Sequence, residues 1–165
     1  MEDLNRALDK ANKKSAPGAD KVSYKILKLC SEKFKALLLD VYNSCWENGY
    51  FPKVWKTATI VTIPKTENAS VPKDYRPISL LPCLGKTFER MINDRLSIFL
   101  EENNVLPATQ FGFRKKLSAE VQLLRLTQKI HSTWNKKQNY ICAFIDVKKA
   151  FDMVWRNKMK KFGVI

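Results

Sequence analysis

Residues 143–155 read AFIDVKKAFDMVW and carry the strongest chemical signal in the sequence. The first five of them end an apolar run, YICAFIDV at 140–147, which predicts a buried central strand with the carboxylate of Asp146 at its end. Such a carboxylate is well placed to hold a hard cation such as Mg2+, which needs only one or two protein carboxylates when phosphates supply other ligands. The alternative is that Asp146 caps a helix predicted over 148–161, and spacing alone does not separate the two interpretations. Asp152 fits a helix-stabilising residue better than a ligand.

Before this stretch, apolar periodicity predicts helices alternating with short strands, an α+β organisation without internal repeats. The helices are expected over 2–13, from Ser23 to about Cys30, from Ser31 to Gly49, over 85–101 and from Ser118 onward, with Ser23, Ser31 and Ser118 as the side-chain caps. Strands over 57–64 and 76–81 are expected to form a hairpin around the polar loop 66–74. The residues expected to face inward are Phe34, Leu37, Leu38, Val41, Tyr42 and Cys45, then Phe88, Met91, Ile92, Leu96, Phe99 and Leu100, then Leu123, Leu126, Ile130 and Trp134.

The composition narrows the class of protein. The chain has 165 residues, 45% of them apolar, which is enough for one domain with a real core. No apolar run reaches the roughly 18 residues of a membrane span, so no membrane association is expected. Four scattered cysteines without a CxxC pair, together with a single histidine, exclude a zinc finger and favour a reducing, intracellular compartment, nuclear or cytoplasmic.

The charge indicates a polyanionic partner. Lysine and arginine number 30 against 16 acidic residues, giving a formal charge of +14. Many of the cations occur as doublets, namely Lys13-Lys14, Lys115-Lys116, Lys136-Lys137, Lys148-Lys149 and Lys160-Lys161. Surface lysines can simply keep a protein soluble. Doublets near turns favour binding to a phosphate backbone, because a polyanion rewards many cations through counterion release.

A family resemblance rests on five ordered blocks. FIDVKKAFDMVW (144–155) resembles the first catalytic-aspartate block of reverse transcriptases. The preceding blocks are KSAPGADKVSYKILK (14–28), FPKVWKTATIVTIPK (51–65), DYRPISLLPCLGKTFERMINDRL (74–96) and QFGFRKKLSAEVQLL (110–124). Together they are most similar to the enzymes of non-LTR, LINE-type, jockey-like retrotransposons. The resemblance implies the fingers and the beginning of the palm of a right-hand polymerase, incomplete in this chain. Residues 1–52 would form the N-terminal helical part of the fingers, 53–136 the fingers hairpin and helices, and 137–165 the start of the palm.

The resemblance also implies roles for individual residues. Lys65 and Arg76 match fingers residues that close over the incoming deoxynucleoside triphosphate. Asp146 matches the catalytic palm carboxylate that binds Mg2+, and the main-chain carbonyl of Val147 matches a second ligand. Phe151 matches the aromatic steric gate beneath the nucleotide sugar, although without the resemblance a core aromatic is the simpler interpretation.

Nucleic-acid contact is implied for Lys86, Arg114 and Lys115, with RNA template and DNA primer as partners. Three departures from the family pattern stand out: Lys21 replaces a turn glycine of PGPDGI, and where the family often has GFRxGxST this chain has Lys116 for the second glycine and Ala119 for the threonine.

The sequence contains no block that matches the downstream palm carboxylates, and none that matches the thumb. Two-metal chemistry needs several carboxylates, so the 165 residues alone are expected to lack polymerase activity. The resemblance thus predicts a fragment of an RNA-directed DNA polymerase that, when complete, extends a primer with deoxynucleoside triphosphates by two-metal nucleotidyl transfer. Two alternatives to it remain open: a non-catalytic nucleic-acid-binding remnant of such an element, and an incomplete gene model or degraded element without a function of its own.

Overall fold

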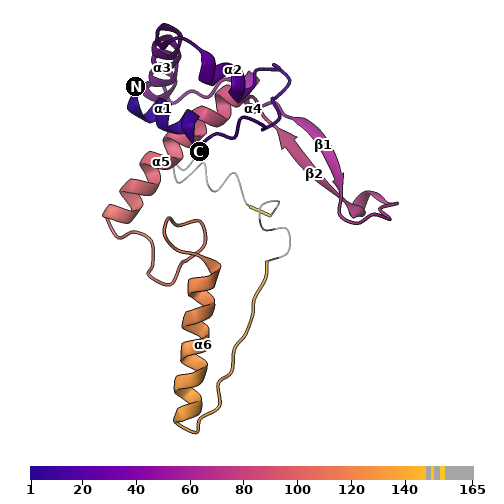
Figure 1. Cartoon of the computed structure of the whole chain (residues 1–165), viewed down its shortest axis with the longest axis vertical. Helices are drawn as coiled ribbons and strands as arrows, with labels where there is room; N and C mark the ends of the chain where they lie inside the picture. Colours follow the sequence, from indigo (N-terminus) through magenta and orange to yellow (C-terminus); the bar gives the residue numbers. More distant parts are fainter. Residues whose placement is uncertain (148–149, 151–152, 155–165) are drawn as a thin grey trace. The chain divides into compact units, whose positions relative to one another are not determined.

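The computed structural model describes residues 1–147, 150 and 153–154, and it divides into two compact units, residues 1–108 and 109–165 (Figure 1). Both helices and strands are present, in agreement with the predicted mixed organisation. Phe151 and almost all of the helix predicted over 148–161 lie outside the described residues.

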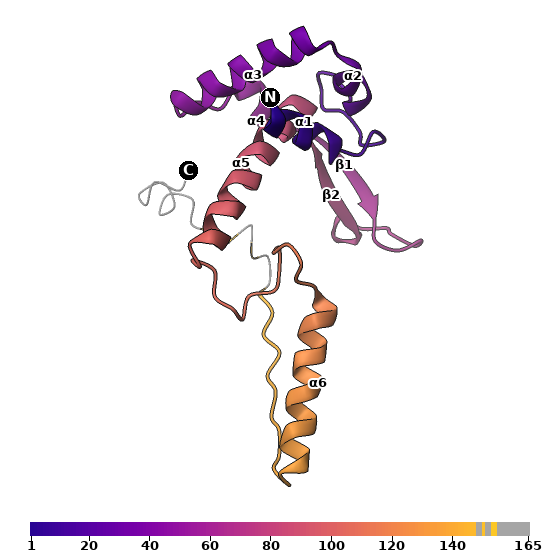
Figure 2. The same ribbon diagram turned by 60° about the vertical axis from the view of Figure 1, so that its left-hand side comes forward.

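The first unit combines helices with one hairpin (Figure 2). Its elements are α1 (Glu2–Asp9), α2 (Tyr24–Leu29), α3 (Glu32–Glu47), α4 (Lys53–Lys56), β1 (Thr59–Pro64), the 3-10 helix η1 (Pro72–Asp74), β2 (Tyr75–Leu80) and α5 (Cys83–Glu102). The prediction placed the end of the first helix too late, because α1 ends at Asp9. The short α4 and η1 were not predicted, since a single turn carries no apolar period. Among the described helices, none has the length and apolar character needed to cross a membrane.

Side-chain caps explain where α2 and α3 begin. The hydroxyl oxygen of Ser23 accepts a hydrogen bond from the Ile26 N–H, and that of Ser31 accepts one from the Phe34 N–H, each at 3.4 Å. These bonds satisfy backbone donors that the first helical turn leaves unpaired. At the other end of α3, Gly49 adopts a positive φ of 58°, which stops the helix. The predicted boundaries of both helices are therefore confirmed to within a few residues.

An aromatic cluster joins α3, α4 and α5. Phe88 of α5 stacks on Tyr42 with ring centroids 5.1 Å apart, and it lies 5.8 Å from Phe51 and 6.1 Å from Trp55. The Tyr42 hydroxyl donates to the carbonyl of Leu84 at 2.8 Å, and burial raises the pKa of this hydroxyl above its ordinary value. Every ring is thus fixed by its neighbours, and Phe88 touches all three of the others.

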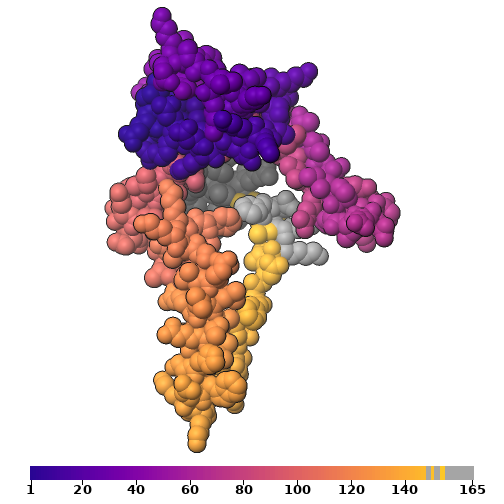
Figure 3. All heavy atoms as spheres, viewed as in Figure 1, coloured from indigo at the N-terminus to yellow at the C-terminus, as the bar shows by residue number. Residues whose placement is uncertain are grey.

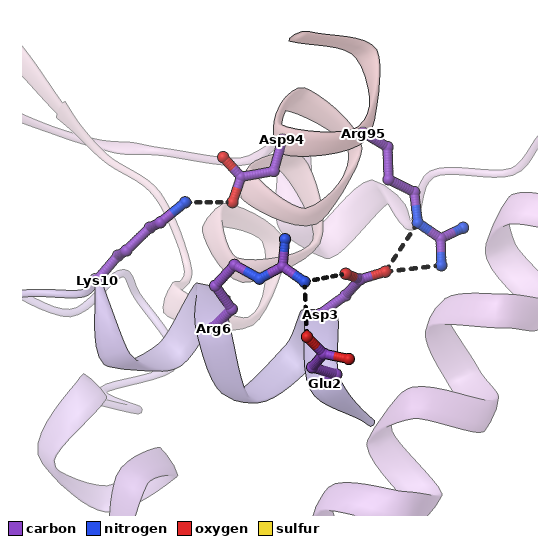
Figure 4. A network of polar contacts seen from close by, with 6 residues as sticks. All are labelled: Glu2, Asp3, Arg6, Lys10, Asp94 and Arg95. Atoms are coloured by element: carbon purple, nitrogen blue, oxygen red, sulfur yellow. Dashed lines mark hydrogen bonds and ion pairs between the residues drawn. The ribbon is translucent and has the colours of Figure 1, made fainter. Parts of the chain in front are cut away.

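α1 packs on α5 and α2 through an apolar face that is flanked by ion pairs (Figure 4). Asp3 contacts Arg95 at 2.8 Å and Arg6 at 3.1 Å, and Lys10 contacts Asp94 at 2.6 Å. Surface ion pairs of this kind contribute about 0–1 kcal/mol each. The larger contribution is apolar burial, from Leu4, Ala7, Leu8 and Ala11, all of which are less than 5% exposed.

Part of the predicted inward face is wrong. On α3, Leu38, Tyr42 and Cys45 are buried as expected, whereas Phe34, Leu37 and Val41 are 43%, 65% and 48% exposed. On α5, Leu96 and Phe99 are likewise exposed. The apolar residues of α3 occupy a wider part of the helix surface than the other described residues pack against. Only one side of the helix is therefore buried.

Gly18 permits a close backbone contact between the loop after α1 and the residues before α5. A Cβ atom at Gly18 would lie 2.5 Å from the Pro82 nitrogen and 2.8 Å from the Leu81 carbonyl carbon. Both obstacles are backbone atoms, which cannot rotate away as a side chain would.

We expect Gly18→Ala to destabilise the chain by about 1–3 kcal/mol, because the added methyl group overpacks this contact. Chemical denaturation followed by circular dichroism measures the change. Gly112→Ala is the matched control, since a Cβ at Gly112 meets no atom within 4 Å. Equal stabilities of the two variants would contradict the assigned role of Gly18.

The two lysines that depart from the glycine pattern occupy glycine-like backbone conformations. Lys21 has a φ of 57° and Lys116 a φ of 63°. This left-handed region favours glycine and is uncommon for residues with a Cβ. The backbone shape implied by the family pattern is therefore retained at both positions although the residue is not.

The second unit consists of α6 (Ala119–Asn135) and the chain on either side of it. Ser118 begins the helix without a side-chain capping bond, contrary to the prediction; a hydrogen bond from Ser118 instead lowers the pKa of the Glu120 carboxylate. The residues predicted to face inward are largely exposed, Leu123 at 60% and Trp134 at 73%. The described part of this unit brings no second apolar layer against them.

The predicted central strand over 140–147 is also wrong. These residues have no regular secondary structure, and Ile141, Phe144 and Ile145 are 92%, 85% and 89% exposed. The segment after α6 runs back beside that helix, as Figures 1 and 2 both show, and Figure 3 shows the same pairing in orange and yellow. A buried strand needs neighbouring strands on its edges. The described residues provide no such neighbour here.

Candidate nucleotide and nucleic-acid site

The hairpin places the two predicted nucleotide-binding cations on one face. β1 and β2 are antiparallel, with Ile63 opposite Arg76, and the pairing extends to Lys65, whose N–H donates to the Asp74 carbonyl at 2.8 Å. Residues directly opposite each other share a face of the sheet, as do residues two apart along a strand. Lys65 and Arg76 are therefore diagonal neighbours on the same face, with backbones about 7–8 Å apart. Both side chains are exposed.

The loop that closes the hairpin is ordered by its own hydrogen bonds. The Asp74 carboxylate accepts from the N–H groups of Ser70 and Val71, both at 3.2 Å, and the Tyr75 hydroxyl donates to the carbonyl of Ala69 at 3.2 Å. The Lys65 ammonium donates to the Lys73 carbonyl across the loop. This lysine is thus held at the tip by a neutral partner, which leaves its full charge available to an anion.

Arg76 has a different environment. In the part of the chain that the structure describes, its guanidinium makes no ion pair or hydrogen bond. Among the described contacts it forms no pair with Asp74, which ends η1 two residues before it and whose carboxylate accepts from the N–H groups of Ser70 and Val71 instead. The pair of cations therefore presents a positive surface to solvent on one face of the hairpin.

Asp146 and Val147 lie in the irregular segment of the second unit, and both are exposed. Their carboxylate and carbonyl oxygens are of the kind that Mg2+ prefers. Two such ligands do not complete a metal site. The described residues contain no group of three or more His, Cys, Asp or Glu side chains that could hold a metal ion. These two residues suit Mg2+ as partial contributors and do not form a metal site by themselves.

The three residues predicted to contact nucleic acid make contacts within the protein. The Lys86 ammonium donates to the Ala16 carbonyl at 3.3 Å and lies 5.6 Å from the centre of the Tyr24 ring. Lys86 therefore ties the loop around Gly18 to α5. Arg114 donates to the carbonyl of Gln110 at 3.2 Å, and Lys115 also has a partner.

A polar stripe on α6 was not predicted. Together with residues from the flanking chain it lines an open hollow formed by Thr109, Gln122, Arg125, Leu126, Gln128, Lys129, Ser132 and Tyr140. Arg125 also lies over the ring of Phe111, 5.2 Å from its centre. Residues 122, 125, 129 and 132 follow helical spacing, which indicates a shared polar face of α6, whereas the apolar pattern used for the prediction indicates only the apolar face.

Comparison with known proteins identifies a protein family whose model matches more than half of the chain. Residues 63–161 match the family model described as reverse transcriptase (RNA-dependent DNA polymerase). The matched region begins in β1 and includes Lys65, Arg76 and Asp146.

Individual relatives extend the similarity over most of the chain. The RNA-directed DNA polymerase from mobile element jockey of Drosophila melanogaster is 36% identical over 94% of this chain. The probable RNA-directed DNA polymerases from transposon BS and from the X-element of the same species are 37% identical over 98% and 36% identical over 85%. This chain spans only 16–18% of the length of these three relatives.

Proposed function

Since the chain belongs to the reverse transcriptase family, we propose that it is a working part of an RNA-directed DNA polymerase from a non-LTR mobile element. The complete enzyme would extend a DNA primer with deoxynucleoside triphosphates along an RNA template. The observation that carries the proposal is the hairpin, which presents Lys65 and Arg76 on one face inside the region that matches the family.

Within that enzyme, residues 1–136 would form the fingers, with the helical part over 1–52, and residues 137–165 would begin the palm. Asp146 and the Val147 carbonyl would contribute to holding Mg2+, with further ligands supplied by phosphates and by other carboxylates of the enzyme. A metal bound there would stabilise negative charge on the reacting phosphate. Phe151 would serve as the steric gate.

The two hairpin cations suit the triphosphate of the incoming nucleotide. Negative charge on its phosphate oxygens grows as the bond to the leaving pyrophosphate breaks. A guanidinium can bind two phosphate oxygens at once, and an ammonium adds a compact point charge. Arg76 and Lys65 are close enough on one face to contact the same triphosphate, which gives the hairpin a role in nucleotide binding.

A chimera tests this proposal: the 165 residues replace the matching segment of the jockey polymerase. We expect RNA-templated, primer-dependent incorporation by the chimera and none by the isolated chain. Arg76→Ala in the chimera should raise KM for the nucleotide about 10- to 100-fold, the value of a lost charge-assisted hydrogen bond.

Lys73→Ala is the matched control, because Lys73 is an exposed cation in the same loop that uses only its backbone carbonyl to hold Lys65. Its KM should stay within about twofold of that of the parent chimera, as for an exposed surface substitution. An Arg76→Ala chimera with an unchanged KM would remove the hairpin from nucleotide binding.

A second function is favoured by the shortage of metal ligands among the described residues. The chain would then be a nucleic-acid-binding module without catalysis. RNA binding by the isolated chain, together with a chimera that binds RNA but incorporates no nucleotide, would support this alternative.

A further inference from the structure

A hollow on the first unit is lined by lysines from three separate segments. Its walls are formed by Asn5, Leu8, Asp9, Lys13, Lys28 and Lys35. Lys13 follows α1, Lys28 belongs to α2 and Lys35 belongs to α3. None of the lining residues comes from the hairpin that carries Lys65 and Arg76.

The fold holds two of these ammonium groups in place. Lys28 donates to the Asp9 carbonyl at the end of α1, at 3.1 Å. Lys35 pairs with Glu32 at 2.7 Å, and its side chain is only 15% exposed whereas that of Glu32 is 70% exposed. The Lys13 side chain is exposed, and the described residues offer it no hydrogen bond or ion pair. The hollow thus combines two positioned cations with one that faces solvent.

More lysines surround the hollow than the helix ends and acidic side chains of this segment require as partners. A cation near the carboxyl end of a helix satisfies free carbonyls, and Lys28 already does this for α1. Residues 10–35 contain eight lysines and two acidic residues, a balance of 8 − 2 = +6 out of the chain's +14. Among the lining residues, three lysines outnumber the single carboxylate of Asp9, and one of these lysines, Lys35, pairs with Glu32 from outside the lining. The positive charge that remains favours the binding of an anion.

We propose that this hollow binds the phosphate backbone of RNA, at a place separate from the nucleotide-binding hairpin. The proposal rests on the proposed function, which supplies an RNA partner. Lysine ammonium groups contact phosphates as point charges and read no base. The flanking lysines of the same segment extend the positive surface beyond one phosphate, and they are Lys14, Lys21, Lys25 and Lys33. A continuous polyanion matches this surface better than a single small anion does.

The test is RNA affinity of the 165-residue chain, measured by anisotropy of a labelled single-stranded RNA of mixed sequence over a range of salt concentrations. The triple variant Lys13→Gln, Lys28→Gln, Lys35→Gln should bind about 10- to 100-fold more weakly near physiological salt. Its plot of log affinity against log salt should be less steep by about 2, since each phosphate contact to a single strand contributes about 0.7.

The matched control removes the same charge from exposed lysines of the first unit that lie outside this lysine-rich segment: Lys53→Gln, Lys56→Gln, Lys73→Gln. It should lose clearly less affinity than the hollow variant. Substitution of Lys13, Lys28 and Lys35 by arginine keeps the charge and should keep the affinity, which separates loss of binding from loss of folding. Circular dichroism checks the helices in each variant.

Two outcomes would overturn the inference: equal losses of RNA affinity in the two glutamine variants, or full RNA affinity in the hollow variant. Neither of these outcomes would contradict the proposed polymerase function, because nucleotide incorporation by the chimera tests that function separately. Conversely, an inactive chimera with intact RNA binding at the hollow would defeat only the proposed catalytic function.

Discussion

Replacement of Phe88 by alanine is expected to destabilise the first unit by about 3–5 kcal/mol, the range for deleting a buried aromatic ring. Phe88 is 5% exposed and contacts Tyr42, Phe51 and Trp55, so its removal leaves a cavity bordered by three other rings. These rings come from α3, from the segment before α4 and from α4 itself, and they cannot all move inward to fill the space. Domains of this size are stabilised by roughly 5–15 kcal/mol in total, so the loss is a large fraction.

Thermal unfolding followed by far-ultraviolet circular dichroism measures this effect. A loss of that size lowers Tm by about 12–40 °C, at roughly 4–8 °C per kcal/mol for a unit of about 100 residues. Phe99→Ala is the control on the same helix, since Phe99 is 58% exposed and should change stability by about 0.5 kcal/mol or less. Similar melting temperatures for the two variants would show that the aromatic cluster does not hold the unit together.

The local structure of the first unit could be predicted from short-range signals. Ser23 and Ser31 act as caps, Gly49 stops α3, and the β-branched run before Pro64 forms one strand of the hairpin. Each of these signals acts through neighbouring backbone, so it needs no knowledge of the rest of the fold.

The predicted burial of a side chain is confirmed only where the described residues include the surface that packs against it. The stripe on α3 is buried at Tyr42, where Phe88 packs on it, and exposed at Leu37. The run ending at Asp146 has the composition of a central strand, yet a strand forms by pairing, and pairing partners are a property of the whole sheet. An apolar pattern indicates which residues tend to be buried, but it does not supply the surface that covers them.

The candidate site also combines features that local structure sets with features that tertiary packing sets. The hairpin was predicted from the sequence, whereas the register that puts Lys65 and Arg76 on one face comes from the structure. The lysine hollow depends on three segments converging after α1 docks on α5 and α2, so charge counting alone predicts a polyanion but not its place. Asp146 stands out in the sequence by its position at the end of an apolar run, and the described residues bring no group of three or more possible metal ligands together around it.

Asp146→Asn in the chimeric polymerase is expected to lower the rate of nucleotide incorporation by about 1,000-fold or more. Loss of an outer-shell partner of a metal ligand typically costs 10–100-fold, and a ligand itself contributes more. An amide keeps the size and polarity of the carboxylate but removes its charge, so it holds a divalent cation poorly. The effect should fall on kcat, and RNA affinity should be unchanged because the lysine hollow is intact.

Asp40→Asn is the control for this substitution, since it makes the same chemical change at an exposed position of α3. Its incorporation rate should stay within about twofold of the parent chimera, as for a surface substitution. Single-turnover incorporation with preformed template and primer separates chemistry from binding. A near-normal rate for Asp146→Asn would remove this residue from the catalytic set, whereas equal losses in KM and kcat would assign it to nucleotide binding. A loss confined to kcat is the result that the family's metal chemistry requires of its first carboxylate.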